Sequence, residues 1–405
     1  MIKEVRIKNF KSVQDLTLPL SRFNILIGSN GSGKSNILEA IAFGAAASAD
    51  RLDNEFLGSR GIRTSEARLM KSAFTDGTSP ESIEINFRII ARNEIGIDYS
   101  HTIFETKSPI PKWSVKENET KYNILQNVVH LLNKLTKEIN DFDVELEKAK
   151  LENISLEKSN LLNDKHVKHK QKIAELESLL HASELVDHNN ILSNFIIYSP
   201  EQSSLRKLEE ESQIQPLGIK GEGLFNLLQI FNENYGQETI NEIKKYLHII
   251  EWFDDFEAVS DKTTERKSLI VKDRFIPSLS LNQHNVNEGF LFLLFYISLI
   301  ISKETPAFFA IDNIEASFHP RLCEELIKQL VELAKNHNKQ LILTTQNPHV
   351  LDGLNLQDVE QSLFVIRRNS EGETIADKIT KQPKNVKLSE AWIRGYIGGN
   401  PETIE

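Results

Sequence analysis

The stretch "FFAIDNIEASFHP", residues 308–320, combines an apolar run with an acid placed at its end. The run "FFAI" is typical of a buried strand, Asp312 follows it directly, and a helix-like pattern comes next. A carboxylate at the end of such a strand is suited to hold Mg²⁺ beside the phosphates of a nucleotide. The other interpretation is an Asp that caps the helix behind it. The sequence predicts a metal-holding Asp312 and leaves the cap as the alternative.

The residue after Asp312 departs from the usual chemistry of phosphate hydrolysis. Many ATPases that place an acid in this way have Glu next, to polarise the attacking water, whereas this chain has Asn313. An amide orients water but accepts no proton. Glu315 is either a substitute base or an acid in the first turn of the following helix, favoured there by the helix dipole. Since a missing base slows such reactions by about a hundredfold to ten-thousandfold, we expect slow hydrolysis.

A phosphate-binding loop is the strongest motif of the chain. "GSNGSGKS", residues 28–35, fits G-x-x-x-x-G-K-[ST], follows the apolar run "FNILI" and opens a helical pattern. Its glycines allow backbone N–H groups to turn towards a phosphate at a helix N-terminus. The alternative is a glycine-rich turn that binds no nucleotide. The predicted cofactors are ATP and Mg²⁺. The predicted nucleotide contacts come from Gly28, Ser29, Asn30, Gly31, Ser32, Gly33, Lys34, Ser35 and Asn36, and Ser35 and Asp312 are the predicted Mg²⁺ ligands.

Composition limits the classes of protein. The chain has 405 residues with a formal charge of -10, so bulk binding of polyanions is excluded and any contact with nucleic acid needs a local basic patch. Cys323 is the single cysteine, which excludes an intramolecular disulfide and fits a reducing compartment. The N-terminus lacks the apolar core of a signal peptide, and the apolar run 289–301 is too short to span a bilayer. We expect a cytoplasmic protein without membrane contact.

Period and composition divide the chain into a head and an insertion. Residues 3–27 predict strands of an N-terminal sheet, and 82–104 predict a hairpin with a turn near Asn93. Further on, the sequence predicts a returning strand in "NFIIYSPEQSSLR", a helical stretch over 222–253, and strands in "FEAVS" and "KSLIVKDRFI". After that, helices at 289 and 320–336 alternate with strands at 307, in "QLILTT" and, as the final strand, in "SLFVIRRN". This order predicts an α/β fold in which a mixed sheet joins a parallel α/β core.

Residues 117–190 contain no glycine or proline and carry apolar residues at alternating spacings of three and four. One seam consists of Leu125, Val128, Leu132, Leu135, Ile139, Phe142 and Leu146, and a second of Leu162, His166, His169, Ile173, Leu176 and Leu180. Two such seams predict an antiparallel coiled-coil arm, and two amphipathic helices lying on the domain are the alternative. The predicted parts are a first head segment over 1–116, the arm over 117–190 and a second head segment over 191–405.

Two features of the arm admit a functional and a plain interpretation. His166 and His169 share one helix face, as metal ligands do, yet at seam positions they equally pack between helices. The stretch "KHVKHKQK", residues 165–172, is suited to contact nucleic-acid phosphates or to form a solvated helix face.

The start of the chain, "VRIKNFKSVQDLTL…FNILIGSNGSGKSNILEAIAF", resembles ABC-type ATPases of the SMC/RecF class, which includes the overcoming-lysogenization-defect (OLD) type. The resemblance implies a head whose two nucleotide motifs flank a coiled-coil arm. It places Asn287, Glu288 and Gly289 of "NVNEGFLFLLFYISLII" at the signature motif, which contacts the nucleotide of a partner subunit, with Asn287 where the family has serine. The segment 316–319, "ASFH", takes the place of the D-loop, and Gln346 that of the switch histidine.

The resemblance also implies partners. ATPases of this class pair head to head, so we expect a homodimer or a higher homo-oligomer. "IDNIEASFHPRLCEELI" is similar to the ATPase subunits of Septu- and PARIS-type antiphage systems, which implies a sensor or scaffold subunit with a separate nuclease or toxin effector. The alternative is a RecF- or SMC-like ATPase that acts directly on DNA. "NVKLSEAWIRGYIGGNP" near the C-terminus is either a docking tail or a segment packed on its own domain.

Overall fold

A computed structural model describes residues 1–74, 80–90, 96–106, 112–116, 133–141, 144, 164–174, 191–207, 216–261, 266–383 and 385–398. Their strands form three sheets. The first is antiparallel, in the order β2-β1-β4-β5-β6, from β1 (Ile2–Phe10), β2 (Val13–Pro19), β4 (Ser82–Ile90), β5 (Gly96–Glu105) and β6 (Trp113–Val115). The antiparallel pairing of β4 with β5 confirms the predicted hairpin, whose turn lies outside the described residues.

The second sheet has six strands in the order β14-β13-β3-β12-β11-β7. They are β3 (Phe23–Ile27), β7 (Ile197–Tyr198), β11 (Phe308–Ile311), β12 (Gln340–Thr345), β13 (Gln361–Arg368) and β14 (Thr374–Ile379). All of its pairs are parallel except that of β13 with β14. The structure therefore confirms the predicted α/β fold with a mixed sheet and a parallel core.

Two expectations about strands are wrong. Residues 23–27 do not continue the N-terminal sheet but form β3 in the second sheet. All five residues of β3 are buried, as in strands covered on both faces, whereas β1 and β2 have exposed positions. "SLFVIRRN" is not the final strand, because β14 turns back and pairs with it.

The side chains of the parallel strands point alternately into two hydrophobic cores. Ile25 of β3 and Leu341 of β12 belong to a core shared with the helices α8 to α11, and Leu26 and Ile342 to a core shared with α1 and the antiparallel sheet. Helix α1 (Lys34–Ser48) is buried along nearly its whole length between the two sheets. The loop before α1 is thereby held from both sides.

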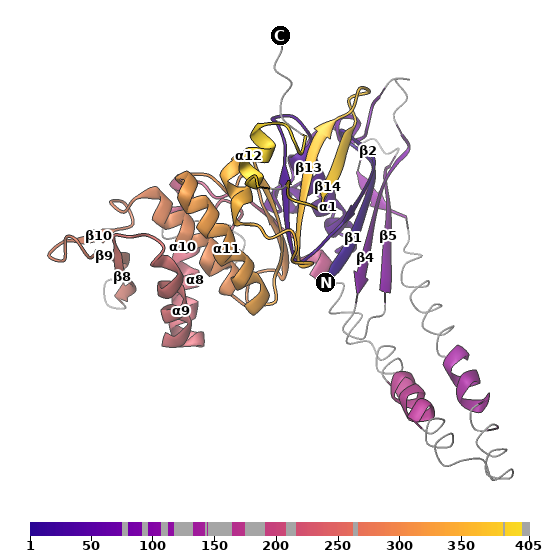
Figure 1. The fold of residues 1–405 in the computed structure, drawn as a ribbon, viewed down its shortest axis with the longest axis horizontal. Helices are drawn as coiled ribbons and strands as arrows, with labels where there is room; N and C mark the ends of the chain where they lie inside the picture. The colour runs from indigo at the N-terminus through magenta and orange to yellow at the C-terminus, as the bar shows by residue number, and fades with distance from the viewer. Residues whose placement is uncertain are drawn as a thin grey trace.

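The helical region lies on the other side of the six-stranded sheet (Figure 1). It contains α8 (Leu224–Ile230), a π-helical turn η1 (Phe231–Tyr235), α9 (Gln237–Leu247), α10 (Glu288–Ile301) and α11 (Pro320–Asn336). The third sheet, β10-β9-β8, adds β8 (Phe253–Asp261), β9 (Arg266–Asp273) and β10 (Ser280–Asn282) and confirms the two strands predicted there. Short helices α2 (Asn54–Ser59), α3 (Ala67–Met70) and α7 (Gln202–Leu205) follow α1 and β7.

Two helical stretches of the predicted arm, 133–141 and 164–174, lie side by side away from the head (Figure 1). His169 Nε2 is 2.9 Å from a carboxylate oxygen of Glu138 across the pair, and Leu135 and Ile173 share one apolar cluster. His169 is thus a seam residue that packs and pairs between the helices. The other seam positions, apart from Ile139 and His166, lie outside the described residues. The bounds of the three predicted parts stay predictions.

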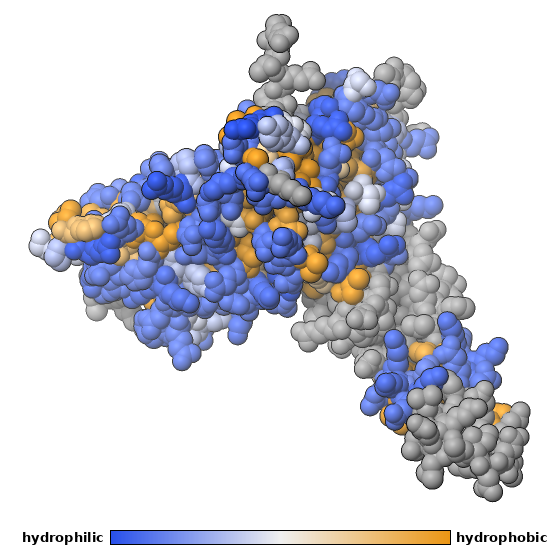
Figure 2. Space-filling view, viewed as in Figure 1, coloured by the Kyte–Doolittle hydropathy of each residue, from blue (hydrophilic) through white to orange (hydrophobic). Residues whose placement is uncertain are grey.

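The C-terminal segment packs on its own domain over 388–392. Helix α12 (Leu388–Ile393) buries Trp392 against the core, and Ser389 Oγ donates a 2.7 Å hydrogen bond to Asp352 in the 3-10 turn η2 (Pro348–Gly353). A different apolar feature is exposed at the far end of the helical region (Figure 2), where Phe275 and Leu279 lie in the turn between β9 and β10. Within the part of the chain described, no helix is long and apolar enough to cross a membrane.

Candidate nucleotide-binding site

The loop between β3 and α1 has the backbone that its glycines predict. Gly31 and Gly33 lie at φ 74° and 107°, a region that side chains disfavour. Two glycines also allow close packing, because an added Cβ would lie 2.2 Å from the carbonyl oxygen of Ile366 at Gly28 and 2.1 Å from Thr374 Oγ1 at Gly33. Only glycine fits these positions without movement of β13 or β14. The loop ends at Gly33, the N-cap of α1. The N-terminus of a helix is a favourable place for a phosphate.

Lys34 is curled over this loop. Its ammonium donates hydrogen bonds to the carbonyl oxygens of Gly28, at 2.8 Å, and Ser29, at 3.0 Å. Burial lowers the pKa of Lys34, and the nearby carboxylates of Asp312 and Glu315 counteract part of that effect. The cation and the two acids predicted from distant segments therefore belong to one site.

Asp312 connects the end of β11 to the phosphate loop. Ser35 Oγ donates a 3.2 Å hydrogen bond to Asp312 Oδ2, and Thr344 Oγ1, at the end of β12, donates to Asp312 Oδ1. The helix-cap interpretation of Asp312 is wrong: α11 begins only at Pro320, and His319 is its N-cap. Residues 314–317 form turns instead of a helix.

The turn after Asp312 excludes one of the two interpretations of Glu315. Glu315 is not a first-turn helix acid, because no helix begins there. Its Oε1 accepts a 2.8 Å hydrogen bond from the backbone N–H of Gln346, and its Oε2 is buried without a hydrogen-bond partner among the described residues. Asn313 is exposed at φ 57°, and its N–H donates to Thr344 Oγ1 at 2.9 Å. Glu315 thus joins the turn to the predicted switch, and Asn313 presents its amide to solvent.

The predicted signature residues lie on the turn 312–319 of the same chain. Asn287 caps α10, since its Oδ1 accepts a 2.8 Å hydrogen bond from Phe290 N–H. Ser317 Oγ donates to Glu288, and the carbonyl oxygen of Ser317 lies 3.4 Å from an ideal Cβ on Gly289. The predicted signature and D-loop positions therefore form one partly exposed surface. Ser317 joins Glu288 and Gly289 in this surface, and among the described residues no hydrogen bond or ion pair joins it to the phosphate loop of this chain.

Residues distant in the sequence, outside every predicted motif, support the loop from behind. Thr374 Oγ1 of β14 donates to the carbonyl oxygen of Ser32 at 3.1 Å and is 2.7 Å from Ser12 Oγ, which also accepts a hydrogen bond from Asn36. Arg368 donates to the carbonyl oxygen of Gly31 at 3.1 Å. No sequence motif links Thr374 to the loop, because more than 300 residues separate the two and a motif spans only a short stretch. Thr344 alone had a signal, in the paired threonines that end "QLILTT".

These groups fit a Mg²⁺-nucleotide. A hydroxyl and a carboxylate, the oxygen ligands that Mg²⁺ prefers, already lie together as Ser35 and Asp312. The loop brings a lysine and a helix N-terminus to the same place, and Ser32 Oγ is buried there without a partner among the described residues. The donor set is therefore that of a phosphate site with one hard cation.

Solved structures of similar fold are Smc head domains. A head bound to the C-winged helix domain of ScpA aligns with a TM-score of 0.55 at 13% identity, over 93% of this chain and 97% of that one. The Pyrococcus furiosus head with an extended coiled coil, bound to the C-terminal domain of ScpA, gives 0.51 at 13% identity over 98% and 99%. The Pyrococcus yayanosii head with a coiled coil and joint gives 0.51 at 12% identity over 97% and 98%. At these identities the likeness concerns the fold.

A curated relative matches locally. The OLD nuclease of Thermus scotoductus is 44% identical over 41 residues, which are 10% of this chain and 8% of that protein. The fold is that of an Smc head domain. The chain belongs to the family of the AAA ATPase domain, whose model matches residues 1–351.

Proposed function

We propose that this chain binds ATP with Mg²⁺, hydrolyses it slowly, and uses the long-lived ATP state to hold two heads together. The observation that carries the proposal is the convergence of Lys34, Ser35 and Asp312 on one loop, next to an amide instead of an acid at position 313. The family match over most of the chain supports the ATPase class.

The residues divide the work as follows. Lys34 exchanges its bonds to the loop carbonyls for phosphate oxygens, and the backbone N–H groups of the loop complete the cradle. Ser35 and Asp312 hold Mg²⁺, which offsets phosphate charge when bound. Thr344, at the end of β12, holds both the Asp312 carboxylate and the backbone of Asn313, so a movement at the end of β11 is transmitted to the end of β12.

Slow hydrolysis follows from the two candidates for a base. Asn313 is exposed next to the metal-holding acid but accepts no proton. Glu315 could accept one, yet one of its oxygens already accepts the Gln346 N–H and the other is buried. A base must reach the water that it deprotonates. We therefore assign Asn313 to orienting water, and Glu315 and Gln346 to coupling the turn with the switch.

The decisive experiment restores the missing acid. We expect Asn313→Glu to raise steady-state turnover about a hundredfold, with ATP affinity nearly unchanged, because a base accelerates the chemical step alone. Position 313 is left-handed, so the new Glu also costs about 1 kcal/mol of stability. Turnover is measured by phosphate release and affinity by equilibrium binding. Asn313→Gln, which adds length without a base, is the matched control and should stay slow.

Glu315→Gln tests the competing assignment. We expect it to leave turnover within a few-fold, because the amide oxygen still accepts the Gln346 N–H. If Glu315→Gln abolishes turnover while Asn313→Glu has little effect, Glu315 is the base. If wild-type turnover is fast and neither change alters it, the slow-clamp proposal is wrong.

At the cellular level we propose the sensor or scaffold subunit of an antiphage defence complex that controls a separate nuclease or toxin. The local match to an OLD nuclease supports this assignment. So does the exposed apolar turn with Phe275 and Leu279, because apolar groups in such positions serve partner contacts. Phage challenge of cells that carry the gene with its neighbours tests it. Protection that is lost with Lys34→Ala and with deletion of a neighbouring nuclease gene is the expected result.

The second candidate is an ATPase of DNA repair or chromosome maintenance that acts directly on DNA. Two observations favour it: the Smc-like fold over nearly the whole chain, and the exposed lysines along 164–174. It predicts ATP-dependent DNA binding by the isolated chain that falls steeply with salt. Under the defence proposal the isolated chain needs its effector for any effect on nucleic acid.

A further inference from the structure

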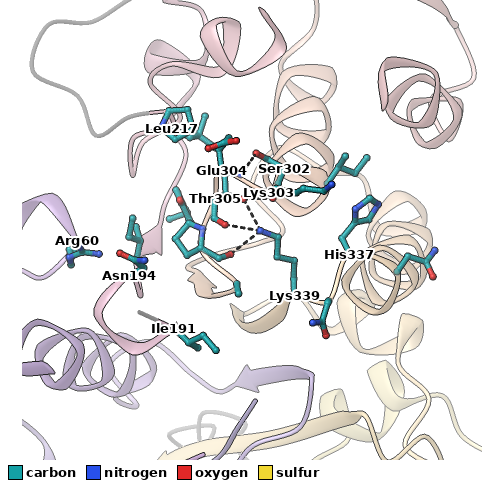
Figure 3. A pocket seen from close by; sticks show the side chains of 18 residues that line it. Arg60, Ile191, Asn194, Leu217, Ser302, Lys303, Glu304, Thr305, His337 and Lys339 are labelled. Atoms are coloured by element: carbon teal, nitrogen blue, oxygen red, sulfur yellow. Dashed lines mark hydrogen bonds between the residues drawn. The ribbon is translucent and has the colours of Figure 1, made fainter. Parts of the chain in front are cut away.

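A second cavity lies at the end of the parallel sheet opposite the nucleotide site. It measures about 890 Å³ and is lined by residues that directly precede β11 and β12, together with Arg60 and the segment that leads into β7 (Figure 3). Asp312 and Gln346 follow the other ends of the same strands. Because β11 and β12 are parallel, the cavity lies at the N-terminal ends of these strands and the nucleotide site at their C-terminal ends. Its volume is in the range of sites for small organic ligands.

The cavity wall is rich in cations. Arg60, Lys303 and Lys339 line it together with the ring of His337, and Glu304 is the one carboxylate among the described lining residues. Glu304 accepts a hydrogen bond from Tyr235, and His337 pairs with Glu242 at 2.9 Å. Charge on the wall is therefore unbalanced towards the positive.

Lys339 is buried and Arg60 is half-buried, and no described acid forms an ion pair with either of them. Lys339 is 4% exposed and donates to Thr305 O, Thr305 Oγ1 and Pro306 O at 2.8, 3.0 and 3.1 Å (Figure 3). Arg60 donates to Phe195 O at 3.2 Å, and its Nε is buried with no partner among the described residues. Burial lowers the pKa of Lys339 to about 8 and also lowers that of Arg60. An anion that binds beside such groups stabilises their positive charge, because it replaces part of the lost solvation.

Arg60 is the group with donors to offer. Its guanidinium stacks on the Phe56 ring, 4.2 Å from the centroid, which orients its planar fork. A planar guanidinium fork matches phosphate oxygens better than a single ammonium does. Next to it, Ile196, Leu217 and Ile301 give the cavity an apolar wall that covers the uncharged part of a ligand.

We propose that this cavity is a binding site for a small phosphate ester of about mononucleotide size, with Arg60 on the phosphate and Lys303 at the rim. The site is independent of the nucleotide loop. It lies beside residues 191 and 194, in the first described stretch after the arm helix 164–174.

The test measures binding of AMP and of inorganic phosphate by calorimetry to the full chain with Lys34→Ala, which removes the phosphate loop as a competing site. We expect AMP to bind, inorganic phosphate to bind more weakly, and uncharged adenosine not to bind. Adding Arg60→Gln should weaken AMP about tenfold or more, and Lys303→Gln about twofold to fivefold. Arg88→Gln, an exposed arginine of β4 paired with Asp98, is the matched control and should change nothing.

The outcomes separate this site from the proposed function. Arg60→Gln and Lys303→Gln in the otherwise natural chain should bind ATP at the loop as before, and thermal unfolding checks that Arg60→Gln is folded. Binding of inorganic phosphate as tight as that of AMP would reduce the site to a free-phosphate site. If neither probe binds the Lys34→Ala chain, or if both variants bind AMP unchanged, the proposal is refuted.

Discussion

At the scale of single residues, the site depends on a few hydrogen bonds, each made by a single side-chain or backbone atom. Thr344 Oγ1 contacts Asp312 and Asn313, and the Gln346 N–H contacts Glu315. Asparagine fits position 313 for two reasons: it tolerates the left-handed backbone there, and its side-chain amide can bind water. The departure at position 313 therefore concerns chemistry and backbone together.

Lys34 is the residue on which nucleotide affinity depends most. We expect Lys34→Ala to weaken ATP binding on the order of a hundredfold or more, since a charge-assisted contact to phosphate is lost. Equilibrium binding of a fluorescent ATP analogue measures the change. Lys328→Ala is the matched control, because Lys328 is exposed on α11 and pairs with Glu324 and Glu325. Unchanged affinity in Lys34→Ala would contradict the assignment of the loop.

At the scale of elements, the position of α1 between two sheets holds the phosphate loop. Its C-terminal end is attached to the antiparallel sheet by Ser48 Oγ, which is 2.8 Å from His101 Nε2 on β5. His101 is 1% exposed and packs against the Phe87 ring. A charged imidazole there has no water to solvate it, so this contact exists with neutral histidine.

That burial predicts an acid sensitivity. Burial lowers the pKa of His101 from 6.5 to about 4. As the pH falls, His101 therefore binds a proton at a higher pH in the unfolded chain than in the folded one. Stability is therefore complete above pH 6.5 and falls as the pH drops towards 4, by about 3 kcal/mol from this group. Urea unfolding at a series of pH values measures the slope.

His101→Gln should remove this contribution, because glutamine does not titrate in that range. The difference between the two unfolding curves then isolates His101 from the carboxylates, which titrate in both proteins. Parallel pH dependences of the two proteins would show that His101 is charged or solvated in the folded state.

At the scale of the whole molecule, the phosphate loop and the predicted signature surface lie in contact with different parts of the chain. Glu288 and Gly289 contact the turn at Ser317, and Asn287 caps α10. Among the described residues, no hydrogen bond or ion pair joins these three to the loop 28–36. A site that needs both surfaces has to be completed by a second copy. This geometry supports the proposed pairing of heads.

We expect the chain to dimerise with ATP and Mg²⁺, and to do so most stably as wild type or Asn313→Gln, since slow turnover preserves the bridging nucleotide. Light scattering with and without nucleotide measures the mass. Gly289→Arg should block the dimer and leave ATP binding intact. Gly289→Ala, whose Cβ makes an ordinary contact with Ser317, is the control. A monomer under all nucleotide conditions would count against the head-to-head proposal.

The sequence by itself determined the local structure of the site and the class of fold. The glycine pattern of 28–35, the apolar run before Asp312 and the strand–helix alternation all act over a few residues, where backbone sterics and side-chain period decide conformation. They predicted the loop, the parallel core and a paired helical insertion.

Only the tertiary structure decided which distant groups meet. Ser35 and Asp312 are 277 residues apart, and Thr374 reaches the loop from β14 because packing of the parallel sheet brings them together. It also replaced the helix expected after Asp312 by a turn in which Glu315 binds the Gln346 N–H, a contact with no local signature. The cation-lined cavity likewise depends on five segments that share no pattern. Such contacts follow from how whole elements pack, a property that no short window of sequence contains.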